Sequence, residues 1–338
     1  MDDAKLISSK VSLILDLPPS CVQFCPTHPD LCVVGTYNLE KNEEDVQANH
    51  QDPDNDEAAT ATKTPQSRNG SLLVYRILQP PSPDSFSTIS YLRPPVPSWK
   101  RSGRCSGGDI EYRDIGCFQT GPYKQRIIST APHLDKQCNW HPEMPYMIGV
   151  TTSTSSALLL RLDDAYSITE YADLNIANSL EAWCIAFSFG TVKPDQDKVQ
   201  ITAYCGGDDS MLRYTSCISD LRESDPLCEE PYSPITIKGQ HNAGVTAILP
   251  LPLLIKNNGR VVVTGSYDDH LRVLIIHDLH ETYGMKKVEL VLEENMGGGV
   301  WRLDLVKIRE GAESTKIRIL ASCMHAGARI VDLEVRRA

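Results

Sequence analysis

Short apolar segments alternate with polar turns along much of the chain. Buried or alternating apolar positions fill each segment, and Pro, His and Asp turn signals separate neighbouring segments. The clearest in the first half are 21–26, 31–37, 71–77, 134–140, 146–152 and 157–162. Runs of this length and alternation predict β-strands. We therefore expect an all-β protein.

One pattern recurs in the second half of the chain. The string Tyr-Cys-Gly-Gly-Asp-Asp-Ser-Met-Leu-Arg at 204–213 returns as Val-Thr-Gly-Ser-Tyr-Asp-Asp-His-Leu-Arg at 263–272, and a degenerate copy occupies 321–329. Each copy is a strand, a tight turn and the start of a second strand, and another apolar strand precedes it. Four-strand units that repeat every ~40–60 residues are typical of a β-propeller.

The repeats predict a single WD40-type β-propeller over residues 1–338. Five repeats are recognisable, and the last three start near Glu181, Gly244 and Gly299. The step from Leu162 to Glu181 is too short for a full blade. We expect about five to seven blades, and the sequence leaves open whether the ring is complete.

Two segments depart from the strand pattern. Residues 38–70 are rich in Asn, Asp, Glu, Gln and Thr, and they have almost no large apolar side chains. Such a segment cannot bury enough surface to order itself, so we predict a disordered acidic insertion in the first blade. Attraction of a basic partner is the alternative role for its charge. Residues 98–126 are rich in Gly, Arg, Ser and Cys, and we predict an irregular segment there.

Charge and cysteine content narrow the possible partners. The formal net charge of −11 argues against nucleic acid, and it suits a cationic partner. The 11 cysteines include no CxxC pair, which favours reduced thiols inside the cell. We see no signal peptide and no transmembrane span, so we expect a cytoplasmic monomer without membrane contact.

Acidic turn residues have a structural explanation in such a propeller. In WD-type blades the turn Asp bonds to a preceding His, and Asp209 and Asp268 occupy that place, with His241 as a candidate partner. Asp208 stands one residue away from this register, so the fold requires it less.

The last repeat breaks the turn pattern, because Cys323-Met-His325 replaces the usual Gly-Ser-x-Asp. Cysteine and histidine form one nucleophile-and-base combination, and His is the usual general base near neutral pH. The alternative is a turn histidine and a buried cysteine without a catalytic role.

Two tryptophans hold one register. Trp183 and Trp301 each fall one residue after the first apolar position of a strand, and Thr246 holds this place between them. Equivalent positions of a propeller lie on one ring, so both indoles should face the same end. Tryptophan is the strongest cation–π partner, so this rim could bind a cationic group. The alternative is that both rings fill the core.

Several enzyme motifs are missing from the sequence. We find no G-x-S-x-G elbow, no P-loop, no dinucleotide fingerprint after a strand and no H-E-x-x-H. No cysteine or histidine cluster has convincing zinc-ligand spacing. We therefore expect neither a metal nor a cofactor.

Taken together, the motifs resemble one family. They are Leu-Glu-Ala-Trp at 180–183, Cys-Gly-Gly-Asp-Asp at 205–209, Val-Thr-Gly-Ser-Tyr-Asp-Asp-His at 263–270, Met-Gly-Gly-Gly-Val-Trp-Arg at 296–302 and Cys-Met-His-Ala-Gly at 323–327. In this order they closely resemble the WD-repeat methylesterase of diphthamide biosynthesis, also called diphthine methyltransferase. The resemblance is loose over 21–76 and good over 180–332. One repeat of that family is missing after Leu162, and its short closing strand does not follow 331–333.

The resemblance implies hydrolysis of the methyl ester of methylated diphthine on translation elongation factor 2. We expect His325 to act as the base, with Cys323 as the less favoured nucleophile and Arg302 stabilising negative charge. Trp183 and Trp301, with Glu181 and Asp208 nearby, would hold the quaternary ammonium group of the substrate. The alternative function is a non-catalytic WD-repeat scaffold, for example in membrane trafficking. Methyl transfer is disfavoured, because nothing resembles a methyl-donor nucleotide site.

Overall fold

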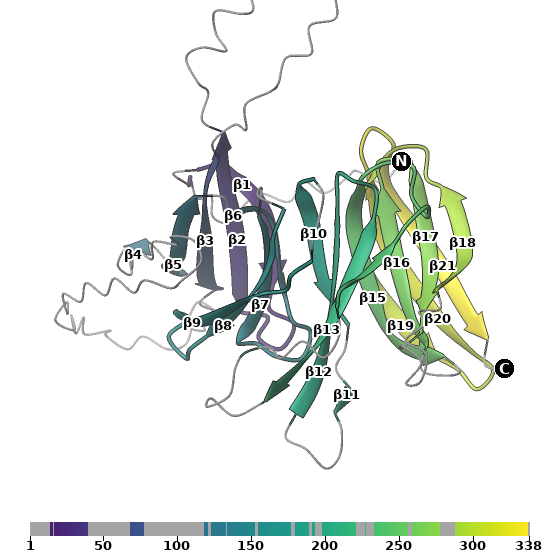
Figure 1. Cartoon of the computed structure of the whole chain (residues 1–338), viewed down its shortest axis with the longest axis horizontal. Coiled ribbons are helices and arrows are strands. Elements are labelled where there is room, and N and C mark those ends of the chain that lie inside the picture. Colours follow the sequence, from purple (N-terminus) through teal and green to yellow (C-terminus); the bar gives the residue numbers. More distant parts are fainter. Residues whose placement is uncertain are drawn as a thin grey trace, which may run out of the picture.

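The computed structural model describes most of the chain as β-strands and turns (Figure 1). The described residues are 14–15, 17–39, 68–77, 118–120, 123–132, 134–152, 155–176, 180–188, 191–192, 198–220, 227, 233–255, 259–277 and 288–336. Within these ranges no helix has the length and hydrophobicity that a membrane crossing requires.

Five antiparallel sheets form the blades of a β-propeller. The first blade has the strand order β1-β2-β3-β5-β4, with bounds Pro19–Phe24, Leu31–Leu39, Arg68–Ile77, Tyr123–Pro132 and Phe118–Thr120. The second blade is β6-β7-β8-β9, with bounds Leu134–Trp140, Met147–Thr152, Ala157–Leu162 and Ile168–Asp173.

The other three blades follow in chain order. The third is β10-β12-β13-β14, with bounds Ala182–Phe187, Lys198–Gly207, Leu212–Asp220 and Ile235–Ile237, and β11 (Thr191–Val192) pairs with β12. The fourth is β15-β16-β17-β18, with bounds Val245–Ile255, Gly259–Ser266, His270–Ile276 and Val288–Asn295. The fifth is β19-β20-β21, with bounds Val300–Glu310, Ser314–Cys323 and Gly327–Arg336.

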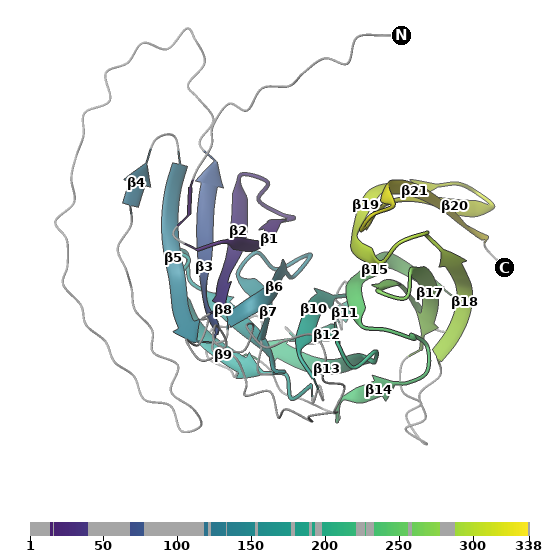
Figure 2. The same ribbon diagram turned by 90° about the horizontal axis from the view of Figure 1, so that it is seen from above.

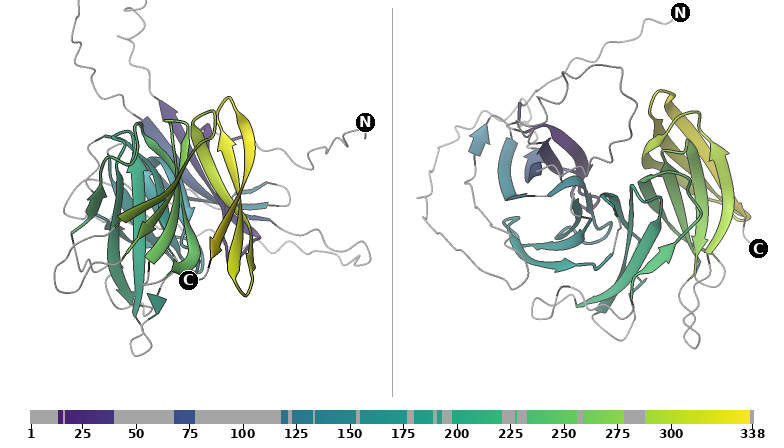
Figure 3. Two further views of the ribbon diagram at one scale, coloured as in Figure 1. Left: turned by 90° about the vertical axis from the view of Figure 1, so that its right-hand side faces the viewer. Right: turned by 45° about the horizontal axis from the view of Figure 1, so that its top comes forward.

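The first strands of the blades bring consecutive blades together. Strand β6 contacts β1 and β10, and β15 contacts β10 and β19. The blades therefore follow one another around an arc, with the first and fifth blades at its two ends (Figures 2 and 3). This arrangement confirms the predicted propeller, and its five blades match the five repeats seen in the sequence.

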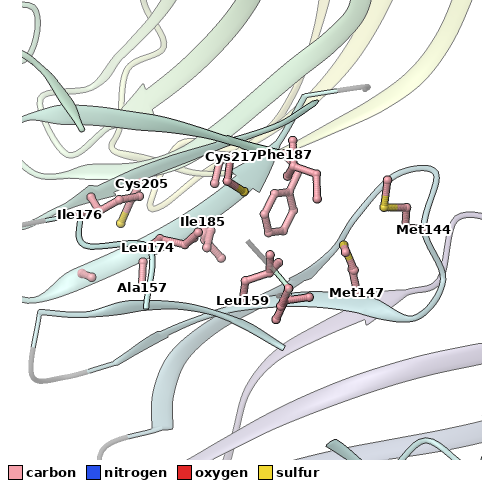
Figure 4. Close-up of a cluster of buried hydrophobic side chains, with 14 residues drawn as sticks. Met144, Met147, Ala157, Leu159, Leu174, Ile176, Ile185, Phe187, Cys205 and Cys217 are labelled. Atoms are coloured by element: carbon pink, nitrogen blue, oxygen red, sulfur yellow. The ribbon is translucent and has the colours of Figure 1, made fainter. Parts of the chain in front are cut away.

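Apolar side chains fill the space between neighbouring blades. Between the second and third blades, Met147 and Leu159 lie close to Ile185 and Phe187 (Figure 4). The fit is tight: a Cβ atom on Gly149 would come within 2.4 Å of the Phe187 ring. Interiors packed at this density lose several kcal/mol when a large side chain is truncated, roughly 3–5 kcal/mol for Phe to Ala.

The two segments that we predicted to lack strands, 38–70 and 98–126, contain strand residues at their ends. Strand β4 and the first four residues of β5 fall inside segment 98–126, which we predicted to be irregular, and β5 pairs with β3 as an outer strand of the first blade. In segment 38–70, residues 38–39 and 68–70 extend β2 and β3. The remaining residues of both segments lie outside the described ones.

The predicted turn aspartate is present, but it has a different partner. The Asp268 carboxylate accepts hydrogen bonds from the backbone N–H of Asn242 (2.8 Å) and pairs with Arg272 (Nη2–Oδ2, 2.8 Å). The expected bond to His241 is wrong, because His241 Nε2 lies 2.9 Å from Thr264 Oγ1 instead. Arg272 is fully buried and needs a carboxylate, so it takes the place of the histidine.

Candidate functional site

A β-bulge occurs at the same place in three successive first strands. The pairing register shifts between Ala182 and Cys184 in β10 and at the equivalent places in β15 and β19. The residues within these bulges are Trp183, Thr246 and Trp301, so the common register predicted from the sequence is confirmed. A bulge re-aims the side chain that it carries and is frequent beside active sites.

The turns between the second and third strands lie beside these bulges. The backbone N–H groups of Asp208, Tyr267 and Met324 donate to the carbonyl oxygens of Glu181, Gly244 and Gly299, at 3.1, 3.0 and 3.0 Å respectively. These three turn residues are therefore structurally equivalent. Each of these three blades therefore brings one bulge residue and one turn residue to the same end of the propeller.

Three rings from three blades make one continuous surface, which we call the aromatic row: Trp183, Tyr267 and Trp301. The Trp183 and Tyr267 centroids lie 5.1 Å apart, with ring planes at 89°. The Tyr267 and Trp301 centroids lie 5.7 Å apart, at 49°. Trp301 is 46% exposed and Trp183 is partly buried. The core-filling alternative is therefore wrong for Trp301.

Two glycines make room for the aromatic row. A Cβ atom on Gly244 would come within 2.3 Å of the Trp183 ring. A Cβ atom on Gly299 would come within 2.8 Å of Met324 Sδ and 3.1 Å of the Tyr267 ring. Real side chains do not tolerate a contact as short as the one at Gly244, so the position of the Trp183 ring depends on this glycine. At Gly299 a side chain would require Met324 and the Tyr267 ring to shift.

Acidic groups accompany the aromatic row. Asp208 is exposed, and its backbone bond to Glu181 places these two residues next to each other. Burial raises the pKa of the Tyr267 hydroxyl, and the negative charge of Asp208 raises it further. Asp208 therefore acts electrostatically on the middle ring. Aromatic faces with a nearby carboxylate attract cations.

Cys323 and His325 lie in different environments. Cys323 is 2% exposed, and burial raises the pKa of its thiol, so the reactive thiolate is disfavoured. His325 is exposed in the turn between β20 and β21. Its Cε1 atom lies 3.5 Å from the place that a Cβ on Gly298 would occupy. The imidazole thus lies beside the turn that leads into Trp301.

Arg302 follows the bulge of β19 and is half-buried. Its backbone pairs with Ser322, one residue before Cys323. Burial raises the pKa of the Cys184 thiol, and the positive charge of Arg302 acts in the opposite direction. The charge of Arg302 therefore also acts on the first strand of the third blade.

Comparison with known proteins gives two relatives, while no family model matches the chain. A diphthine methyltransferase of Saccharomyces cerevisiae is 32% identical over 162 residues, which cover 46% of this chain and 38% of that protein. A diphthine methyltransferase of Schizosaccharomyces pombe is 23% identical over 228 residues, 64% of this chain and 63% of that protein. The chain is a distant homologue of these diphthine methyltransferases. It covers less than two thirds of the length of either relative.

The site contains two residues that the sequence did not single out, Tyr267 and Met324. Aligning the three copies by the arginine that follows each turn would have placed both at the position of Asp208. Across the described ranges, no group of three or more His, Cys, Asp or Glu side chains is arranged to hold a metal ion.

Proposed function

We propose that the chain hydrolyses the methyl ester of methylated diphthine on translation elongation factor 2 and releases diphthine and methanol. The two relatives carry the name diphthine methyltransferase, which supports a role in diphthamide biosynthesis. The observation that carries the proposal is the aromatic row beside Asp208, because methylated diphthine bears a quaternary ammonium group. A cytoplasmic location for a monomer that needs no cofactor belongs to the same proposal.

The substrate cation would lie against the aromatic row. Quaternary ammonium groups cannot donate hydrogen bonds, so proteins recognise them through aromatic faces and negative charge. Trp183 and Trp301 present the faces, and Asp208 and Glu181 supply carboxylates at the same end. In this proposal the ester would lie toward the neighbouring turn of the fifth blade, where His325 is exposed.

His325 would act as general base on a water molecule. The water oxygen attacks the ester carbonyl carbon, and His325 takes up the proton that the water loses. The tetrahedral intermediate then expels the methoxy group, which leaves as methanol with that proton. Arg302 offers a positive charge near the fifth blade for the developing oxyanion. Cys323 would have no direct part, because it is buried as a thiol.

Methanol release from methylated elongation factor 2 tests these roles. General bases contribute about 10²–10⁴-fold to rate, so we expect His325→Ala to slow methanol release by that factor. Cys323→Ser is the matched control from the same turn, and we expect it to keep most of the activity. Full activity of a folded His325→Ala protein would contradict the assignment of the base. Loss of activity in a folded Cys323→Ser protein would instead favour a cysteine nucleophile.

A further inference from the structure

Two cysteines from different blades face each other at the inner end of the first and second blades. The Sγ atoms of Cys21 in β1 and Cys138 in β6 lie 3.1 Å apart, although 117 positions separate them in the sequence. The backbone N–H of Cys138 also donates to Cys21 Sγ at 3.2 Å. We call these two residues the thiol pair.

The strands β1 and β6 hold the two sulfur atoms of the thiol pair close together. Cys21 directly follows the pairing irregularity in β1, and Cys138 directly follows the one in β6. The two cysteines therefore hold equivalent positions in adjacent blades. The backbone at Gly35 packs directly against Cys21, since a Cβ atom there would come within 2.8 Å of Cys21 Sγ. The sulfur atoms would need to move only about 1 Å to reach disulfide bond length.

The two thiols differ in acidity. Hydrogen bonding from the Cys138 thiol lowers the pKa of Cys21 most strongly; burial opposes this, and the N–H of Cys138 assists it. The same thiol interaction raises the pKa of Cys138, and burial adds to that increase. Within the thiol pair the negative charge therefore favours Cys21 over Cys138, and a thiolate next to a thiol is the combination that reacts with peroxides.

We propose that Cys21 and Cys138 are an oxidisable dithiol site, which a small hydroperoxide converts into a disulfide that joins the first blade to the second. The Cys21 thiolate attacks one oxygen of hydrogen peroxide, and the O–O bond breaks. Cys21 becomes a sulfenic acid, and the departing hydroxide takes up the proton that the Cys21 thiol lost on ionisation and becomes water. The Cys138 sulfur then attacks the Cys21 sulfur, its proton leaves with the hydroxyl group, and a second water forms. Two thiols are oxidised and one peroxide is reduced to two waters.

Burial restricts the oxidant to small molecules. Cys21 is 5% exposed and Cys138 is 1% exposed, so a bulky disulfide such as oxidised glutathione has poor access to the sulfur atoms. Cys184 and Cys32 have different surroundings from the thiol pair. Cys184 Sγ donates to the carbonyl oxygen of Val245 at 3.4 Å, and burial alone raises the pKa of Cys32. We therefore expect oxidation to select the thiol pair.

Peptide mapping of the full chain tests the proposal. The reduced protein is treated with hydrogen peroxide, blocked with a thiol reagent, digested without reductant and analysed by mass spectrometry. We expect a peptide that joins Cys21 to Cys138, lighter than its two parts by two hydrogens, to form before any other linked pair. Cys32→Ser, a buried cysteine of the same blade, should leave this peptide unchanged, whereas Cys138→Ser should remove it.

Thermal unfolding gives a second readout on the wild-type chain. A crosslink that closes a loop of this length restricts the unfolded state, so peroxide should raise Tm by about 5–10 °C, and a reductant should reverse the increase. Three results would overturn the proposal: another cysteine pair linking first, sulfinic acid on Cys21 without a crosslink, or no reaction of a folded protein with peroxide. Equal rates with hydrogen peroxide and oxidised glutathione would contradict the inferred size limit.

Discussion

Trp301 is the most accessible ring of the aromatic row, because it is 46% exposed whereas Trp183 and Tyr267 are partly buried. Cation–π contacts contribute about 0.5–2 kcal/mol according to their desolvation. We therefore expect Trp301→Ala to weaken binding of tetramethylammonium by about 3- to 30-fold. Calorimetric titration measures this affinity.

Matched probes separate cation binding from simple apolar contact at Trp301. Trp301→Phe keeps an aromatic face and should retain part of the affinity. Choline should bind the wild-type chain more tightly than 3,3-dimethylbutanol, which has the same shape without the charge. Equal binding of these two molecules would mean that the aromatic row does not recognise positive charge.

At the scale of one element, the turn between β16 and β17 depends on a buried ion pair. Arg272 is fully buried, and its guanidinium group contacts Asp268 and Glu293 at 2.8 Å each. Removing one partner of a buried pair leaves an uncompensated charge and costs about 3–5 kcal/mol. We expect this loss for Arg272→Leu in urea unfolding.

Arg318 provides the contrast for this prediction. It pairs with Asp332 across β20 and β21, but both side chains are more than half exposed. Exposed pairs contribute little, so Arg318→Leu should leave the unfolding midpoint almost unchanged. A smaller effect of Arg272→Leu than of Arg318→Leu would show that the buried pair does not hold the fourth blade together.

The strands that were predicted and those that were missed differ in their burial. Strands β7 and β16 are buried along their whole length, so their apolar runs were visible in the sequence. Strand β9 is mostly half-exposed and gave no such signal, although it completes the second blade. Strand β5 was missed because its first residues lie in the Gly- and Arg-rich segment 98–126.

The candidate site was predictable only in part. Trp183 and Trp301 could be found, because repeat register alone places equivalent residues on one ring. The role of Tyr267 could not be read locally, since it depends on ring contacts to two other blades. The pairing of Cys21 with Cys138 has the same origin: it requires two first strands, far apart in sequence, to lie side by side.

At the scale of the whole molecule, two buried histidines make stability depend on pH. Burial lowers the pKa of His141 to about 4. Burial, assisted by the charge of Arg272, lowers the pKa of His241 to about 4. In the unfolded chain both titrate near 6.5, so unfolding takes up protons between pH 6.5 and 4. Stability is therefore complete above pH 6.5 and falls as the pH decreases toward 4.

The expected loss is up to about 3 kcal/mol for each histidine. Asp268 does not contribute in this window: although its burial acts to raise its pKa, hydrogen bonds and the charge of Arg272 lower it to about 2. Urea unfolding at pH 7, 5.5 and 4.5 measures the dependence, and His241→Gln should halve its slope. A free energy of unfolding that stays constant over this range would contradict the claim that His141 and His241 stay neutral in the folded protein.

The central claim is that the chain hydrolyses a methyl ester. The most direct test is the intact mass of a peptide from elongation factor 2 that carries methylated diphthine, recorded after incubation with the folded chain, with and without a methyl donor. Our account predicts the loss of one CH₂ unit and the release of methanol without any donor. A gain in mass that requires the donor would show methyl transfer, and an unchanged mass would favour a non-catalytic scaffold; either result would contradict the account.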